Sequence, residues 1–251
     1  MKGAEPIFID RGSDVGILML HGFTSTPRQF RELADFLSAR GFTVCAPLVA
    51  GHGTDPADLI KTGPKDWQES VKKSYLELKQ KVKKVIIIGN SFGSNLGFWL
   101  IKETNNEPVA IVSLGAPIYF RWHRFIKFRV KLYGRFRKYY HKPARVYKTD
   151  YTDMNDEVSY PVLPVKNIRD LFKFIEGETR PNLIKVKIPV LIANATGDLV
   201  IDKKSANYIF SNIGSDVKEI FWFNGRHHGI ARSGCEGLFP KIYSFIKEVV
   251  R

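Results

Sequence analysis

The sequence contains too few cysteines for a disulfide-stabilised protein. Only Cys45 and Cys235 occur in 251 residues, and their spacing fits neither a disulfide framework nor a metal-binding motif. We interpret both as ordinary buried thiols in a reducing cytoplasm. The first residues, MKGAEPIFIDRGS, lack the apolar core of a signal peptide, and no window approaches the roughly 18 apolar residues of a membrane span. We therefore expect a soluble, cytoplasmic protein.

The six histidines show no metal-binding arrangement. No pair has the i, i+4 spacing with an adjacent glutamate that a zinc-binding helix of the zincin type requires. We expect neither a metal nor an organic cofactor.

Acidic residues are absent from one stretch, residues 121–148, which contains 11 Lys and Arg. The whole chain has 39 basic and 25 acidic residues, a net charge of +14, so this stretch carries most of the excess. A basic, aromatic-rich helix can face an anionic lipid surface, cover an apolar pocket, or be solvated. Nucleic acid is a poorer candidate partner, because the stretch has no recognisable reading motif. Its aromatic residues are Trp122, Phe125, Phe128, Tyr133, Phe136, Tyr139 and Tyr140.

Apolar runs typical of buried strands alternate with stretches of helical periodicity. We predict strands at 15–20, 43–48, 84–89, 109–114, 188–195 and 218–223, and helices at 27–40, 64–81, 92–103, 202–213 and 236–250. This alternation predicts an α/β fold, a mostly parallel sheet with helices on both faces. It is interrupted once by a basic, mostly helical segment. We therefore divide the chain into an α/β domain, residues 1–116 and 186–251, and an inserted cap segment, residues 117–185.

A candidate nucleophile lies in the stretch VIIIGNSFGSNLG, residues 85–97. Gly89, Ser91 and Gly93 form a G-x-S-x-G pattern directly after a predicted strand and directly before a predicted helix, the pattern of a nucleophile elbow. The sharp turn needs small residues on both sides of the serine, and it places the Phe92 N–H at a helix N-terminus, where negative charge is stabilised. A glycine-flanked serine in an ordinary loop is the alternative.

A serine nucleophile needs a base and a carboxylate, which should follow later strands in that sheet. Asp198 follows the predicted strand at 188–195, and Asp202 is a second acid that fits better at the start of a helix. His227 and His228 both follow the last predicted strand, and either could be the base. An early loop, His21-Gly22-Phe23, follows the first buried strand and could supply a second oxyanion N–H from Phe23.

With these motifs together, the sequence resembles the α/β-hydrolases, and more narrowly the small bacterial carboxylesterases and monoacylglycerol lipases. The resemblance implies that Ser91 is the nucleophile, Asp198 the acid and His227 the base, with Phe23 and Phe92 as oxyanion-hole amides. It favours His227 over His228 because the family commonly has N-S-x-H at the position of residues 224–227. The matching stretches are HGFTSTP (21–27), GHGTDPADL (51–59), GNSFG (89–93), ATGDLVI (195–201) and IYSFIKEV (242–249).

Two departures from the family pattern concern the shape of the acyl pocket. The elbow continues with Ser94-Asn95 where the family usually has a second glycine, and His228 stands where the family tends to have an aliphatic residue.

The resemblance implies a serine hydrolase that cleaves short to medium acyl esters or monoacylglycerols through an acyl-enzyme. Two other readings remain: hydrolysis of C–C bonds in ring-cleavage products, and a non-catalytic protein that binds anionic lipid through the basic cap. The expected partner is a small-molecule ester, and the oligomeric state stays open.

Overall fold

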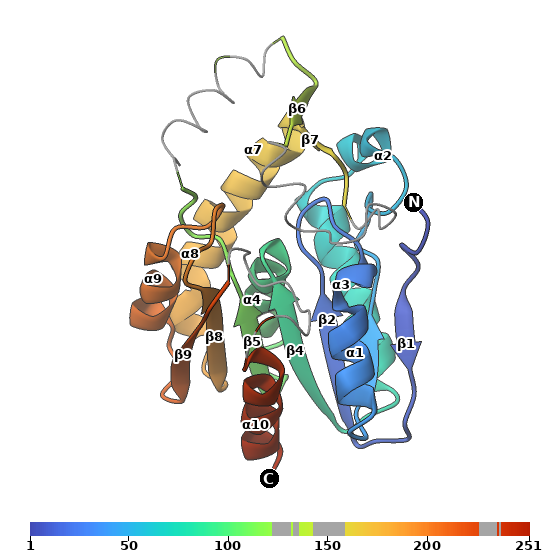
Figure 1. The fold of residues 1–251 in the computed structure, drawn as a ribbon, viewed down its shortest axis with the longest axis vertical. Coiled ribbons are helices and arrows are strands. Elements are labelled where there is room, and N and C mark those ends of the chain that lie inside the picture. The colour runs from blue at the N-terminus through green and yellow to red at the C-terminus, as the bar shows by residue number, and fades with distance from the viewer. Residues whose placement is uncertain (122–131, 133–135, 143–158, 226–234, 236) are drawn as a thin grey trace.

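The computed structural model describes residues 1–121, 132, 136–142, 159–225, 235 and 237–251. A seven-stranded sheet runs through the molecule in the order β1-β3-β2-β4-β5-β8-β9 (Figure 1). All neighbouring pairs are parallel except β1 and β3. The sheet is thus mostly parallel, as predicted. Its strands are β1 (Ile7–Ile9), β2 (Val15–Leu20), β3 (Thr43–Ala46), β4 (Lys84–Asn90), β5 (Ala110–Leu114), β8 (Val190–Ala195) and β9 (Lys218–Phe223).

Helices cover both faces of this sheet because the central strands are apolar on both sides. In β4, Ile86 and Ile88 belong to the core under α1 and α10, whereas Val85 and Ile87 belong to the core under α3, α4 and α9. Helices α1 and α10 lie on the viewer's side in Figure 1. The layered arrangement confirms the predicted fold class. The bounds are α1 (Arg31–Ser38), α3 (Pro64–Lys79), α4 (Phe92–Glu103), α9 (Lys204–Asn212) and α10 (Leu238–Val250), with a 3₁₀ helix at Pro27–Phe30.

Two short elements in this part of the fold were not predicted from the sequence. Helix α2 (Pro56–Lys61) has six residues, too few to show a helical period, and its start is set by Asp55, whose side chain accepts a hydrogen bond of 2.7 Å from the Ala57 N–H. Strand β1 has three residues and pairs antiparallel with β3 at the edge of the sheet.

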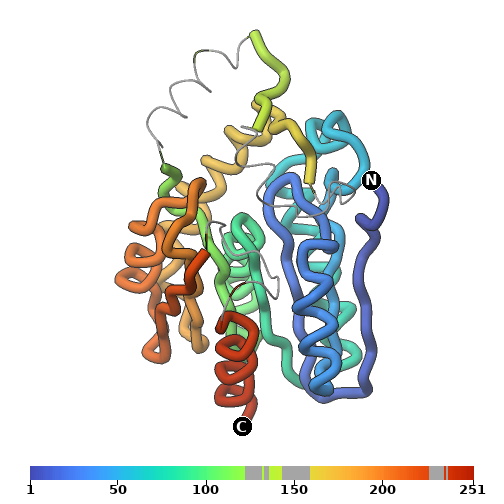
Figure 2. The backbone as a smooth tube through the Cα atoms, viewed as in Figure 1, coloured from blue at the N-terminus to red at the C-terminus, as the bar shows by residue number. Residues whose placement is uncertain are grey.

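The cap segment separates the neighbouring strands β5 and β8. Its described residues 136–142 and 159–164 lie above the carboxyl ends of the strands, and the following residues descend beside the sheet to the start of β8 (Figure 2). It contains an antiparallel pair, β6 (Tyr139–His141) and β7 (Val162–Pro164), which the sequence did not predict. Helix α7 (Val165–Phe174) follows, then a π-helical turn (Ile175–Thr179), α8 (Arg180–Asn182) and a 3₁₀ turn (Leu183–Lys185). Most of the predicted basic helix, residues 122–131 and 133–135, lies outside the described residues.

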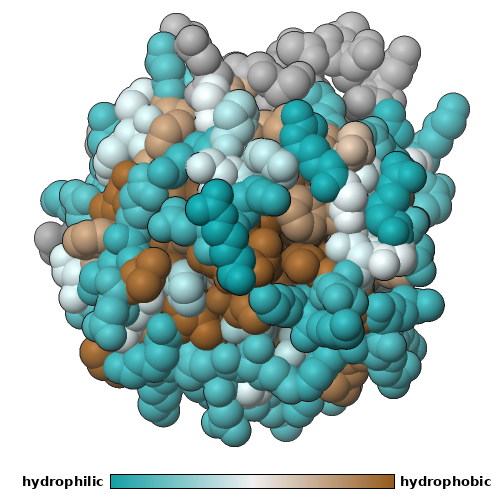
Figure 3. All heavy atoms as spheres, turned by 90° about the horizontal axis from the view of Figure 1, so that it is seen from below, coloured by the Kyte–Doolittle hydropathy of each residue, from teal (hydrophilic) through white to brown (hydrophobic). Residues whose placement is uncertain are grey.

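Figure 3 views the molecule from below, the side opposite the cap segment, and shows apolar side chains among hydrophilic ones. Exposed apolar side chains are common on protein surfaces. None of the helices in the described ranges combines the length and apolar character needed to cross a membrane.

Candidate active site

Ser91 joins the end of β4 to the start of α4 in a strained backbone conformation. Its φ is 50° and its ψ is −121°, a region that residues other than glycine rarely occupy. The Ser91 N–H donates a 2.7 Å hydrogen bond to the Leu114 carbonyl of the neighbouring strand β5, which holds the turn. This strand-turn-helix geometry is what the G-x-S-x-G pattern predicts.

The two glycines around Ser91 are required because the elbow leaves no room for a side chain at either position. A Cβ atom on Gly89 would lie 2.4 Å from the Ser94 Cα, and one on Gly93 would lie 1.8 Å from the Leu20 carbonyl oxygen. Both contacts are with backbone atoms, which cannot move aside cheaply. The elbow therefore excludes any larger residue at either position.

Ser94 and Asn95, where the sequence departs from the family pattern, have structural partners. The Ser94 Oγ donates to the Gly89 carbonyl at 2.7 Å, which closes the elbow. The Asn95 Nδ2 donates at 3.1 Å to the Pro117 carbonyl and to the Thr179 Oγ1. Asn95 thereby joins α4 to both ends of the cap segment.

The loop after β2 lies directly against Ser91. A Cβ atom on Gly22 would be 3.4 Å from the Ser91 Cβ, so the backbone of this loop passes close to the serine. The Ser25 N–H donates to the Gly22 carbonyl at 3.0 Å, which closes a tight turn around Phe23, and Thr24 adopts a left-handed φ of 62°. The Gly22 N–H donates to the Gln29 Oε1 at 2.7 Å. Because this loop contains Phe23, the predicted oxyanion donor, we call residues 21–25 the oxyanion loop.

Two buried histidines support the oxyanion loop, and the sequence had not assigned them a role. The Val49 N–H donates to the His21 Nε2 at 3.0 Å, so the proton is on Nδ1, which donates to the Gly22 carbonyl at 3.0 Å. The His52 Nδ1 donates to the Ala50 carbonyl, also at 3.0 Å, and the two rings lie 5.0 Å apart.

Burial keeps both rings neutral. Desolvation, with a smaller effect of His52, lowers the pKa of His21 to about 3. Desolvation likewise lowers the pKa of His52 to about 4. A neutral His21 can accept the Val49 N–H, and a protonated one cannot, so the loop needs the uncharged form.

Asp198 follows β8 and is buried at the same edge of the sheet as Ser91, because β4, β5 and β8 are consecutive parallel strands. Its Oδ1 accepts hydrogen bonds from the Val200 N–H at 2.7 Å and the Ile201 N–H at 2.9 Å. Asp202, the alternative acid, instead accepts the Lys204 N–H at 2.9 Å at the start of α9. This contact agrees with the predicted helix-start role of Asp202.

His227 and His228 lie outside the described residues. The chain that leads to them is described as far as Gly225, after β9 has ended at this same edge of the sheet. The Gly197 N–H donates to the Gly225 carbonyl at 2.8 Å. The residue before Asp198 therefore contacts a residue two positions before His227.

The ring centroids of Phe23 and Phe92 lie 6.2 Å apart, and both rings pack on Trp67. Phe174, at the end of α7, packs edge-on against Phe92, with 5.3 Å between the ring centroids. Phe23 packs against the other apolar side chains of α7, so this helix contacts both residues predicted to supply the oxyanion N–H groups. Among the residues that the structure describes, no group of three His, Cys, Asp or Glu is placed to hold a metal ion.

The sequence profile of the serine aminopeptidase S33 family matches residues 13–233, which is most of the chain. The chain belongs to the serine aminopeptidase S33 family. This S33-family chain is 28% identical over 247 residues to a carboxylesterase of Bacillus subtilis (strain 168), with 96% of each protein covered. It is 31% identical over 228 residues to a thermostable monoacylglycerol lipase of Bacillus sp. (strain H-257), with 91% of this chain and 88% of that protein covered.

A similar solved structure comes from work on LipS and LipT, two metagenome-derived lipolytic enzymes. It shares 26% identity with the S33-family chain, covers 99% of both chains and has a TM-score of 0.87. The S33-family protein is therefore a hydrolase with the α/β-hydrolase fold, of the esterase and monoacylglycerol lipase type.

Proposed function

We propose that the protein hydrolyses short to medium acyl esters or monoacylglycerols through an acyl-enzyme, with Ser91, Asp198 and His227 as its catalytic triad. The Ser91 Oγ attacks the ester carbonyl while the His227 Nε2 takes its proton. The Phe23 and Phe92 N–H groups donate to the oxyanion. His227 then protonates the leaving alcohol, and water activated by the same base releases the acid.

The conformation of Ser91 carries this proposal. A backbone held at φ 50° between two glycines that tolerate no Cβ is costly to maintain, and such strain is concentrated at functional sites. The oxyanion loop beside Ser91 and the buried Asp198 at the same edge of the sheet support the same chemistry.

The names of the relatives favour an ester over a peptide as substrate. The family is named for an aminopeptidase, but the two curated relatives described above, matched over nearly the whole chain, are named carboxylesterase and monoacylglycerol lipase. Initial rates on p-nitrophenyl butyrate, monobutyrin and an aminoacyl p-nitroanilide separate the two classes. Turnover of the anilide alone would overturn the ester proposal.

The decisive experiment compares three alanine variants on p-nitrophenyl butyrate. We expect Ser91→Ala and His227→Ala to lose on the order of 10⁴- to 10⁶-fold in kcat while the fold is retained. His228→Ala is the matched control and should keep most of the activity. If His228→Ala is inactive while His227→Ala is active, the base is assigned to the wrong histidine. If Ser91→Ala is active, the nucleophile is assigned to the wrong residue.

We also propose that the basic cap segment binds an anionic lipid surface, where a lipid ester would be found. In its described part, Phe136 is 85% exposed and Leu132 is 50% exposed, and the exposed Arg137 and Lys138 follow Phe136 in the chain. Exposed apolar and basic side chains together suit an anionic interface. In this arrangement residues 117–185 form a cap on the catalytic domain, which consists of residues 1–116 and 186–251.

A further inference from the structure

The first junction of the cap segment, residues 118–121, is bound to the loop that carries Asp198. Phe120 forms an antiparallel bridge with Ile201, and the Arg121 N–H donates to the Val200 carbonyl at 2.9 Å. The Asp202 N–H in turn donates to the Tyr119 carbonyl at 2.9 Å. This short ladder fixes the backbone of Val200 and Ile201, whose N–H groups hold the Asp198 carboxylate.

Arg121 adds a direct contact with the acid residue. Its Nη1 donates to the backbone carbonyl of Asp198 at 2.8 Å. From sequence alone, Arg121 is simply the first charge of the basic stretch, but the structure gives it a specific partner inside the site.

A second junction between the cap segment and the catalytic domain lies inside the cap, at residues 159–160, which contact the oxyanion loop. Ser159 forms an antiparallel bridge with Ser25, and the Tyr160 N–H donates to the Thr24 carbonyl at 2.9 Å. Thr24 is the residue next to Phe23. The two junctions thus contact the two loops that would carry the acid and one oxyanion donor.

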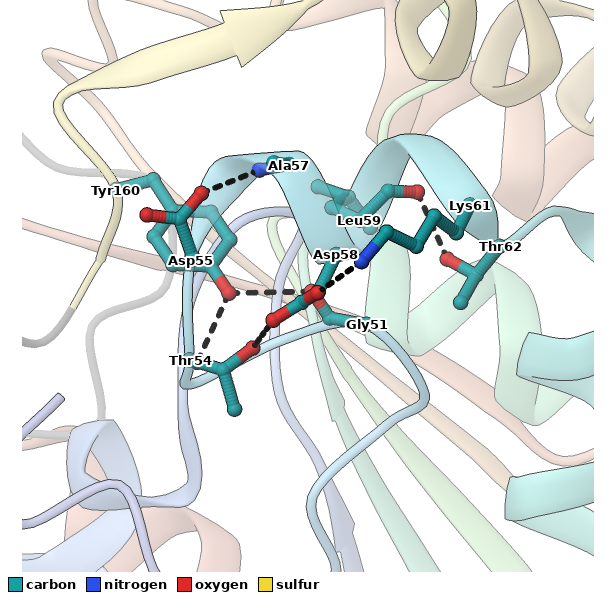
Figure 4. A network of polar contacts seen from close by, with 9 residues as sticks. All are labelled: Gly51, Thr54, Asp55, Ala57, Asp58, Leu59, Lys61, Thr62 and Tyr160. Atoms are coloured by element: carbon teal, nitrogen blue, oxygen red, sulfur yellow. Dashed lines mark hydrogen bonds and ion pairs between the residues drawn. The ribbon is translucent and has the colours of Figure 1, made fainter.

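Tyr160 also fixes this second junction to the protein beneath it. Its hydroxyl donates to the Gly51 carbonyl at 3.1 Å and accepts the Thr54 N–H at 3.0 Å, as Figure 4 shows. The side chain is only 1% exposed. Residue 160 is therefore held by its hydroxyl on one side, while its N–H holds Thr24 on the other.

We propose that Arg121 and Tyr160 are positioning residues, through which the cap junctions hold Asp198 and the oxyanion loop in catalytic geometry. This inference rests on the proposed function. The cap would then take part in catalysis as well as cover the active site. A change at either junction should therefore alter turnover even of a small ester that needs no cap to bind.

Arg121→Met and Tyr160→Phe test the inference with kcat and KM on p-nitrophenyl butyrate, each corrected for the number of active sites by the p-nitrophenol burst. We expect kcat to fall roughly three- to ten-fold, the range for losing ordinary hydrogen bonds, with KM changed less than about two-fold. Arg121→Lys, which keeps one donor, should recover part of the loss. In an Asp198→Asn background, Arg121→Met should have almost no further effect, because it acts through Asp198.

The pH profile separates the two roles. A displaced Asp198 stabilises the imidazolium less, so Arg121→Met should move the acid limb of kcat/KM to lower pH. Tyr160→Phe should lower kcat without moving that limb, because the oxyanion donors do not contact the base.

Two matched controls remove comparable contacts away from the site. The Arg40 Nη1 donates to the Phe36 carbonyl at 2.8 Å, and Tyr75, also 1% exposed, donates its hydroxyl to Glu107 at 2.7 Å. Arg40→Met and Tyr75→Phe should leave kcat within about two-fold of wild type.

The inference is overturned if Arg121→Met and Tyr160→Phe behave like these controls, or if they lower only the melting temperature while kcat per active site is unchanged. Those outcomes leave the proposed function intact as long as Ser91→Ala is inactive. An active Ser91→Ala protein would instead overturn the proposed function itself.

Discussion

Mild acid should destabilise the protein through His21 and His52, which fold only as neutral rings. In the unfolded chain each histidine has a pKa near 6.5 and binds a proton as the pH falls below that value. In the folded protein, burial lowers these pKa values to about 3 and about 4. Because the unfolded state binds more protons in this range, folding stability decreases as the pH falls.

The size of the effect between pH 7 and pH 5 follows from the unfolded pKa, because both folded pKa values lie below the window. Each histidine should lower the free energy of unfolding by about 2 kcal/mol between pH 7 and pH 5. The two together should lower it by about 4 kcal/mol, a large part of the stability of an ordinary domain. The loss begins near pH 6.5 and ends as the pH passes the folded pKa values.

The assay is urea unfolding followed by tryptophan fluorescence at pH 5, 6 and 7, for wild type and His52→Asn. The asparagine side chain keeps a donor for the Ala50 carbonyl but does not titrate. The substitution also changes the stability at every pH, so the measured quantity is the change of the unfolding free energy with pH. We expect that change to be smaller than in wild type by about 2 kcal/mol. Equal pH dependence in the two proteins would refute the assignment of a neutral, buried His52.

Three further predictions concern the elbow, the acid and the cap. Gly93→Ala should lower the free energy of unfolding by more than about 3 kcal/mol, because its Cβ would overlap the Leu20 carbonyl. Gly177→Ala is the control: a Cβ there meets nothing within 4 Å, so its melting temperature should be near that of wild type. Asp198→Asn should lower kcat on p-nitrophenyl butyrate about 10⁴-fold and Asp202→Asn less than about two-fold, and the reverse order would identify Asp202 as the acid. The protein should co-sediment with anionic but not neutral vesicles at low salt. Replacing Arg124, Lys127, Arg129 and Lys131 by Glu should abolish this binding without reducing turnover of a soluble ester. Equal sedimentation with both vesicle types, or with neither, would contradict the lipid proposal.

The strands and the elbow could be predicted from the sequence because their signals are local. Strand β2, helix α4 and strand β9 have the predicted bounds, since an apolar run marks each of the two strands and the elbow glycines flank the serine directly. The strained Ser91 backbone follows from the same five residues.

The contacts between the cap and the catalytic loops could not be predicted, because they join residues distant in the chain. Nothing in the sequence around Ser159 indicates a bridge to Ser25, and nothing around Arg121 indicates a bond to the Asp198 carbonyl. The neutral state of His21 and His52 likewise depends on burial by segments from elsewhere in the chain.

The central claim, that Ser91 is the nucleophile of an acyl-enzyme, is tested most directly by peptide mass spectrometry after reaction with a p-nitrophenyl alkylphosphonate. Attack by the Ser91 Oγ at phosphorus releases p-nitrophenolate and leaves the phosphonyl group on the serine, so the label should occur once per chain, on the peptide containing GNSFG, in proportion to lost activity. Complete inactivation with the label on another residue, or retained activity in protein fully labelled at Ser91, would contradict the account.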